Sequence, residues 1–197
     1  MSEAIRNIDI LLIGGSAGSL QVIFNLLPQL NENIGFPIIV VIHRKAAPGS
    51  HLEAVFKKYT NMPVYEIEDK MPLRANTVYL APADYHVLIE SRTELALDYS
   101  EKMNYSRPSI DVTFQSASEV FGSNVAALLL SGANHDGVRG LKFIKRNGGL
   151  ALVQDPKTAE VNAMPTGAVD KVEIDQLLKP QDMPIYINRF AKTNNSA

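Results

Sequence analysis

Four short apolar runs, each followed directly by a glycine or a polar residue, constrain the fold of this chain more than any other feature. The runs cover residues 8–13, 37–42, 125–130 and 150–153. They are nearly continuous in apolar residues rather than alternating, which is typical of strands buried on both faces in a parallel sheet. We therefore predict that these runs form the centre of an open parallel sheet.

Segments with helical spacing of apolar residues separate these runs. Apolar side chains recur every three or four positions over residues 20–30, and the same spacing returns over 110–121, where Ser109 is placed to cap the helix. A further helix is expected over 137–147, ended by two glycines.

Shorter β-rich segments lie outside this alternation. Residues 78–80, 86–90 and 94–99 indicate edge or hairpin strands, and 172–174 a last strand. The whole pattern predicts an α/β fold: a doubly wound, mostly parallel sheet in a three-layer α/β/α sandwich with an antiparallel hairpin at one edge. We expect one domain over residues 1–192 and a frayed tail at 193–197.

Composition excludes several classes of protein. The chain has 197 residues, with 19 Lys and Arg against 21 Asp and Glu, so the formal net charge is −2 and no overall attraction to nucleic acid is expected. There is no cysteine, which removes disulfides and thiolate metal sites. No apolar run approaches the length of a membrane span, and none resembles a signal peptide. We expect a cytoplasmic protein with no cofactor.

Ligands of open parallel sheets bind where the strands end at their carboxyl edge. The residues that follow the apolar runs are therefore the candidate site. The first run is followed by Ser16 within a glycine-rich turn, the second by His43, and the third by a loop that contains Asp136. A hydroxyl, an imidazole and a carboxylate are the components of an acyl-transfer triad.

The turn Gly14-Gly15-Ser16-Ala17-Gly18 fits the G-x-S-x-G pattern between a strand and a helix. Glycines permit a tight turn that lifts the serine hydroxyl clear of the strand, and backbone N–H groups of the turn can stabilise an oxyanion. The alternative is a phosphate-binding turn in which Ser16 caps the helix. The dinucleotide and Walker patterns both match poorly.

Each candidate also has a structural interpretation. His43 could be an ordinary histidine at a strand end, and Asp136 could cap the helix that begins at Gly137. His51 and His86 do not follow core strands, and His135 is adjacent in sequence to Asp136, so His43 is the favoured base. No spacing of His, Asp or Glu suggests a metal site, and none is expected.

Six blocks of sequence, in order, resemble the protein-glutamate methylesterase (CheB-type) catalytic domain of bacterial chemotaxis. The blocks are IGGSAGS, VVIHR, VYLAPADYH, SRPSIDVTF, LLLSGANHDGVRGLKFIKRNGG and QDPKTAEVNAMPTGAV. The resemblance covers nearly the whole chain. It implies that Ser16, His43 and Asp136 are the family's triad, the same residues that follow the strand ends.

The resemblance also implies a substrate and a mechanism. Members of the family hydrolyse glutamate γ-methyl esters on the cytoplasmic helices of chemoreceptors, and often deamidate receptor glutamines. The backbone at Gly15, Ala17 and Ala133 would support the turn and the oxyanion, while Arg44 and Lys45 would line the substrate rim. The family's receiver domain has no counterpart in these residues, so we expect a stand-alone catalytic domain.

The chain departs from the family pattern close to the predicted site. Ala17 stands where a threonine is usual, Ala133-Asn134 replaces Met-Gly, and His135 precedes the acid. These departures motivate an alternative, a catalytically weak or silent module of the same fold that docks on a receptor or another signalling partner. The sequence does not decide the oligomeric state.

Overall fold

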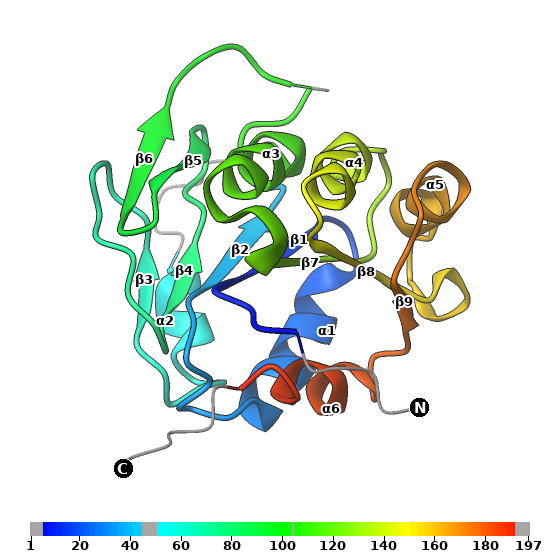
Figure 1. Cartoon of the computed structure of the whole chain (residues 1–197), viewed down its shortest axis with the longest axis horizontal. Coiled ribbons are helices and arrows are strands. Elements are labelled where there is room, and N and C mark those ends of the chain that lie inside the picture. The colour runs from blue at the N-terminus through cyan, green and yellow to red at the C-terminus, as the bar shows by residue number, and fades with distance from the viewer. Residues whose placement is uncertain (1–5, 45–50, 104, 192–197) are drawn as a thin grey trace.

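A seven-stranded parallel sheet runs through the part of the chain that the structure, a computed structural model, describes: residues 6–44, 51–103 and 105–191 (Figure 1). The strand order is β3-β4-β2-β1-β7-β8-β9. The strands are β1 (Ile10–Gly15), β2 (Ile38–Ile42), β3 (Val64–Glu66), β4 (Val78–Leu80), β7 (Val125–Leu129), β8 (Leu150–Gln154) and β9 (Gln176–Leu178).

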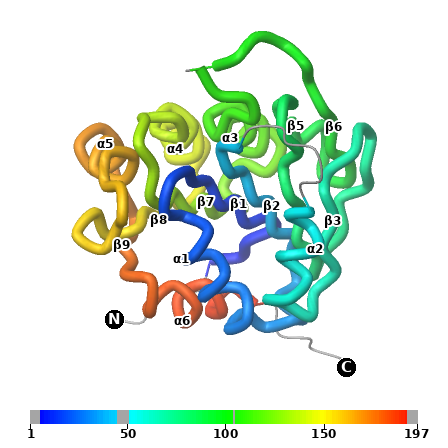
Figure 2. Tube along the Cα trace, turned by 180° about the vertical axis from the view of Figure 1, so that it is seen from behind, coloured from blue at the N-terminus to red at the C-terminus, as the bar shows by residue number. Residues whose placement is uncertain are grey.

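Helices cover both faces of this sheet, which confirms the predicted three-layer sandwich (Figures 1 and 2). One face carries α1 (Ser19–Leu26), α2 (Leu52–Phe56) and α6 (Met183–Asn188). The other carries α3 (Ile110–Phe121), α4 (Val138–Arg146) and α5 (Ala163–Lys171). Short 3₁₀ turns lie at Leu27–Gln29, Gly122–Asn124 and Pro156–Thr158.

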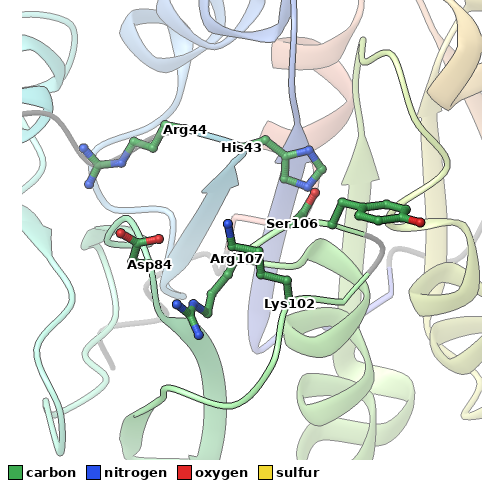
Figure 3. A pocket seen from close by; sticks show the side chains of 7 residues that line it. His43, Arg44, Asp84, Lys102, Ser106 and Arg107 are labelled. Atoms are coloured by element: carbon green, nitrogen blue, oxygen red, sulfur yellow. The ribbon is translucent and has the colours of Figure 1, made fainter.

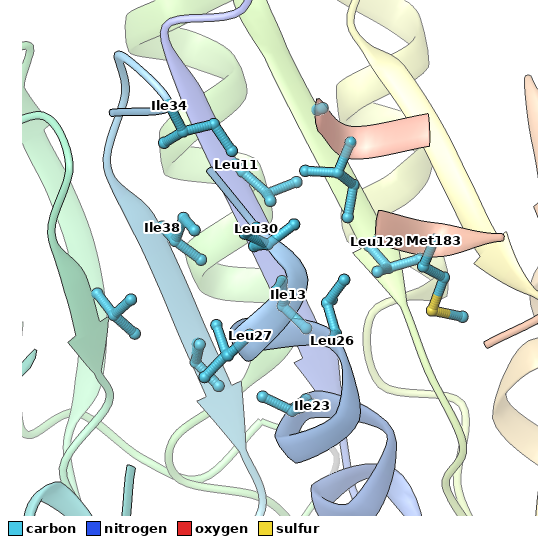
Figure 4. Packing of buried hydrophobic residues seen from close by; sticks show 14 of the residues in the cluster. Leu11, Ile13, Ile23, Leu26, Leu27, Leu30, Ile34, Ile38, Leu128 and Met183 are labelled. Atoms are coloured by element: carbon cyan, nitrogen blue, oxygen red, sulfur yellow. The ribbon is translucent and has the colours of Figure 1, made fainter. Parts of the chain in front are cut away.

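The central strand shows why the apolar runs are nearly continuous. Leu11 and Ile13 of β1 point into the core beneath α1, among the side chains drawn in Figure 4, whereas Ile10 and Leu12 point into the core beneath α3. All four side chains are fully buried. Because successive residues of a strand face opposite sides, a strand covered on both faces needs apolar residues at every position.

The predicted hairpin is present as β5 (His86–Ser91) and β6 (Glu94–Asp98), paired antiparallel in a sheet of their own. It lies near the β3–β4 end of the large sheet (Figure 1) and packs against α3. Two side chains of α3 fix this contact: Thr113 Oγ1 donates to the Val87 carbonyl at 2.9 Å, and the Ile89 N–H donates to Ser116 Oγ at 3.0 Å.

Three details of the sheet differ from the sequence-based expectation. β3 was not predicted, and it makes β4 an internal strand rather than an edge strand. The last strand is β9, not 172–174, because Val172 still belongs to the end of α5, where its N–H donates to the Ala168 carbonyl. Both missed strands are three-residue edge strands with only one buried side chain, so they lack an apolar run. The predicted tail, 193–197, lies outside the described residues.

Candidate active site

Three neighbouring strands end at one edge of the sheet and carry the predicted catalytic residues to it. β1 lies between β2 and β7, and all three run parallel. The His43 N–H donates to the Gly15 carbonyl at 3.2 Å, and the Ser16 N–H donates to the Ser131 carbonyl at 2.9 Å. Ser16 therefore lies between the residue that ends β2 and the loop that leads from β7 to Asp136.

The turn after β1 is tight because glycine occupies two positions where a side chain would not fit. A Cβ at Gly15 would lie 2.5 Å from the Ser19 Cβ, and Gly18 has a left-handed φ of 79°. Ser19 closes the turn, since its hydroxyl donates to the Ser16 carbonyl at 2.6 Å. The turn leaves Ser16 half-buried and Ala17 exposed at the N-terminal end of α1.

His43 and Asp136 form a hydrogen bond across 93 positions of sequence, with 2.7 Å between Nε2 and Oδ2. The Asp136 side chain is fully buried, and 13% of the His43 side chain is exposed. Because Nε2 bonds to the carboxylate, Nδ1 is the ring nitrogen left to accept a proton. An imidazole hydrogen-bonded to a buried carboxylate is the arrangement that the base and its orienting acid have in an acyl-transfer triad.

Asp136 is held by five hydrogen-bond donors. Its Oδ2 accepts from His43 Nε2 and the Ile110 N–H, each at 2.7 Å, and its Oδ1 accepts from Ser109 Oγ at 2.9 Å, the Asp111 N–H at 3.0 Å and the Gly137 N–H at 3.1 Å. Burial alone would raise the pKa of Asp136, but the hydrogen bonds from His43, Asp111 and Ile110 outweigh it and lower the pKa below its ordinary value. The carboxylate therefore stays ionised beside His43.

Sequence reasoning found Asp136 but missed most of what holds it. Ser109 was expected as the cap of α3, yet its hydroxyl donates to Asp136, and Asp136 itself receives the first N–H groups of that helix. Asp136 was expected as the cap of α4. It does accept the Gly137 N–H, but Asp111 accepts both the Gly137 and Gly140 N–H groups, at 2.8 and 2.6 Å. The sequence signal for this second cap was Asp111 itself, an acidic residue in the first turn of α3.

Ala17 and Ala133 are the residues whose backbone N–H groups are predicted to support the oxyanion. Within the ranges that the structure describes, the N–H groups of Ala17 and Ala133 donate to no protein acceptor. Gly132 lies against the serine, since a Cβ there would be 3.1 Å from the Ser16 Cβ. The hydroxyl of Ser16 makes no hydrogen bond to another described residue, so its link to His43 stays a prediction.

A cleft of 490 Å³ opens beside His43 (Figure 3). It is lined by His43, Arg44, Asp84, Lys102, Tyr105, Ser106 and Arg107. Three of these side chains are cationic and one is anionic. Arg44 forms an ion pair with Glu66 and also donates to the Ala81 carbonyl at 3.4 Å. Lys45, the other predicted rim residue, lies outside the described residues.

The described ranges contain neither a metal-binding cluster nor a membrane-spanning helix. No group of three or more His, Asp or Glu side chains there could hold a metal ion. No helix among the same residues is both long and apolar enough to span a bilayer. His135, the neighbour of Asp136, is exposed and packs against Gly167 of α5.

A family model described as CheB methylesterase matches residues 11–187. The chain belongs to the CheB methylesterase family. It is 28% identical to the solved CheB methylesterase catalytic domain of Thermotoga maritima, with a TM-score of 0.88 over 93% of this chain and 98% of that one. This match confirms the predicted fold at the level of the whole catalytic domain.

Relatives of this CheB-family chain carry consistent names. A Leptospira interrogans protein named putative protein-glutamate methylesterase/protein-glutamine glutaminase is 39% identical over 95% of this chain and 97% of its own length. A Rhodospirillum rubrum protein-glutamate methylesterase/protein-glutamine glutaminase is 31% identical over 93% of this chain. The chain spans 49% of that second relative's length.

Proposed function

We propose that the protein is a protein-glutamate methylesterase that hydrolyses γ-methyl esters of glutamate on chemoreceptors and releases methanol. Family membership and the names of the relatives support the reaction. The observation that carries it to this chain is the His43–Asp136 hydrogen bond at the strand ends, beside Ser16 in its glycine turn. The relatives' names also support deamidation of glutamine as a second reaction.

The first half of the reaction makes an acyl-enzyme. His43 Nδ1 accepts the Ser16 proton while Ser16 Oγ attacks the ester carbonyl, and the resulting oxyanion is stabilised by the N–H groups of Ala17 and Ala133. The C–O bond to the methoxy group then breaks, and the His43 cation gives its proton to the departing methanol. Asp136, ionised and buried, stabilises the cation through Nε2.

The second half returns the enzyme to its starting state. A water molecule gives a proton to His43 and attacks the acyl carbonyl, the bond to Ser16 Oγ breaks, and the serine recovers its proton. The products are a glutamate carboxylate and methanol. With glutamine as substrate the same steps release ammonia instead, since only the leaving group differs. Neither route needs a cofactor.

The cleft supports a receptor helix as the macromolecular substrate. It is open beside His43 and is lined by the cations Arg44, Lys102 and Arg107 and by one carboxylate, Asp84 (Figure 3). Glu66 pairs with Arg44, which leaves Lys102 and Arg107 as the main cations of the lining. A cationic lining favours an acidic segment of polypeptide. Since the methylated helices of chemoreceptors are cytoplasmic in this family, we also place the enzyme in the cytoplasm.

The test is methanol release from methylated receptor membranes, run beside labelling with a fluorophosphonate probe. Wild type should release methanol and be labelled at Ser16, and Ser16→Ala should do neither. Wild-type protein that is neither active nor labelled would contradict the proposal and favour the docking-module alternative, which no observation on this chain favours at present.

A further inference from the structure

His86, the first residue of β5, is fully buried and uses both of its ring nitrogens. Its Nδ1 accepts from the Ser109 N–H at 3.1 Å, and its Nε2 lies 3.0 Å from the Glu101 carbonyl. A backbone N–H can only donate, so Nδ1 is unprotonated and the ring proton lies on Nε2, which donates to Glu101. The two contacts fix one tautomer of the ring.

One of these contacts leads to the catalytic acid. Ser109 donates its backbone N–H to His86 Nδ1 and its hydroxyl to Asp136 Oδ1, the latter at 2.9 Å. The next two N–H groups of the chain, those of Ile110 and Asp111, also donate to Asp136. His86, Ser109 and Asp136 are all fully buried, so no water competes for these bonds. His86 therefore anchors the segment that supplies three of the five donors to Asp136.

The other contact leads to the cleft. Glu101 is next to Lys102 and belongs to the segment between β6 and α3 that carries Lys102 and Arg107, two of the residues lining the cleft. Arg107 is tied back to the start of the same segment, since it donates to the Ser100 carbonyl at 2.8 Å. His86 thus holds this segment near its start, at Glu101, and at its end, at Ser109.

We propose that His86 is a positioning residue with two separable effects, one through Nδ1 on the catalytic acid and one through Nε2 on the substrate cleft. The inference rests on the proposed function, because it assigns the effect through Nδ1 to kcat and the effect through Nε2 to KM of the proposed reaction. No hydrogen bond joins His86 to Ser16 or His43 in the described residues, so we assign its effects to Ser109 and Glu101.

Two substitutions separate the effects because asparagine and glutamine each reproduce one nitrogen of the ring. In His86→Asn the amide oxygen takes the place of Nδ1 and accepts from Ser109, but the donor to Glu101 is lost. In His86→Gln the amide nitrogen takes the place of Nε2 and donates to Glu101, but the acceptor for Ser109 is lost. Ser116→Ala is the matched control, since it removes a different bond between β5 and α3.

The experiment measures kcat and KM for methanol release from methylated receptor membranes. We expect His86→Gln to lower kcat by about 10- to 100-fold, the range typical when a group that orients an active-site ligand is removed, with KM within twofold of wild type. His86→Asn should raise KM several-fold and keep most of kcat. Ser116→Ala should change neither. Equal effects of the two His86 variants on kcat, or unchanged kinetics in both, would overturn the proposal.

A second readout needs no substrate. The proton shared by His43 and Asp136 is expected to give a downfield ¹H NMR signal in wild type, His86→Asn and Ser116→Ala, and to shift or broaden in His86→Gln. If wild type released no methanol while this pattern held, the proposed function would fail and the positioning role would stand. An unchanged signal in His86→Gln would overturn the positioning role alone. Should His86→Gln not fold, His86→Asn carries the test against Ser116→Ala: we expect a raised KM with most of kcat kept and an unshifted signal, and a large fall in kcat in His86→Asn would overturn the proposal.

Discussion

Asp136 and Asp111 cap each other's helices. Asp136, just ahead of α4, accepts the N–H groups of Ile110 and Asp111 at the start of α3. Asp111, in the first turn of α3, accepts the N–H groups of Gly137 and Gly140 at the start of α4. Each carboxylate therefore meets the positive end of the neighbouring helix, and the position of Asp136, the proposed catalytic acid, is set by the packing of two helices.

The two carboxyls are close enough to interact, and burial acts to raise the pKa of both, but their net shifts have opposite signs. Burial and the nearby charge of Asp136 raise the pKa of Asp111 from its ordinary 3.8 to about 6, against the lowering effect of the Gly140 and Gly137 N–H groups. The pKa of Asp136 is lowered instead, because it also has the hydrogen bond from His43. Asp136 keeps the negative charge that its proposed role needs, and the pKa of Asp111 is the one that is raised.

We expect Asp111 to make stability depend on pH. A carboxyl whose pKa rises on folding holds its proton more tightly in the folded state, so its contribution is largest below pH 3.8 and is lost as the pH rises through about 6. Relative to Asp111→Asn, the free energy of unfolding of wild type should therefore fall between about pH 4 and 7 by up to about 3 kcal/mol, at about 1.4 kcal/mol per pKa unit. Urea denaturation at several pH values across this range measures the free energy of unfolding of both proteins. If that free energy changed with pH in the same way in both, the raised pKa of Asp111 would be refuted.

Asp136→Asn should reduce both activity and stability. An amide presents an NH₂ group to at least one of the donors that now face the carboxylate, so one hydrogen bond is lost and two donors oppose each other. We expect kcat to fall by about 10⁴-fold, as when the orienting acid of a triad is neutralised, and stability to fall by about 1–3 kcal/mol. Methanol release and thermal unfolding test the two effects, and a variant as active as wild type would remove Asp136 from the mechanism.

Ser16→Ala should abolish hydrolysis and leave the fold intact. The change removes one oxygen from a half-buried side chain, and the conformation of the turn depends on Gly15, Gly18 and the bond from Ser19 rather than on this hydroxyl. The rate should drop by about 10⁴-fold or more, because the nucleophile and its base act as one unit. Circular dichroism and melting temperature should match wild type, and retained activity would mean that another group is the nucleophile.

The elements that position the site were predictable because their signals are local. An apolar run between polar residues marks β1, β2, β7 and β8, and strand ends in a parallel sheet collect at one edge, so Ser16, His43 and Asp136 could be grouped before any coordinates. The short strands β3 and β9 carry one buried residue each and leave no such signal.

The residues that hold the site in place could not be predicted from the sequence, because their contacts join distant segments. The residues next to His86 in sequence indicate only a hairpin strand. Its hydrogen bond to Ser109, 23 positions away, forms because β5 packs on α3. The ion pair of Arg44 with Glu66 likewise depends on the loop after β2 meeting β3. Such contacts depend on tertiary packing, which no local pattern encodes.

Activity should fall as the pH is lowered, because His43 must be unprotonated to accept the Ser16 proton. Protonation of Asp111, whose pKa is raised to about 6, also changes as the pH is lowered. The profile of kcat against pH in Asp111→Asn separates them. We expect kcat of Asp111→Asn to fall at low pH as it does in wild type. If the fall disappeared in this variant, it would be due to Asp111 and not to His43.

The last prediction concerns the cations of the cleft. Arg44 was predicted to line the substrate rim, but its guanidinium is paired with Glu66 and its side chain is only 15% exposed, so its field is largely neutralised. Lys102 also lines the cleft, is exposed, and forms no ion pair with any residue that the structure describes. We therefore expect Lys102→Ala to lower kcat/KM on methylated receptor by about tenfold at low salt, and the deficit to shrink at about 0.5 M salt, where charges are screened.

Arg44→Ala should have a smaller effect on kcat/KM and a larger one on stability, since it breaks a partly buried ion pair and leaves Glu66 without it. Lys58→Ala is the control for net charge, because Lys58 is exposed on the segment after α2 and does not line the cleft. It should match wild type at every salt concentration. If Lys102→Ala and Lys58→Ala lower kcat/KM equally, the effect belongs to the overall charge and not to the cleft.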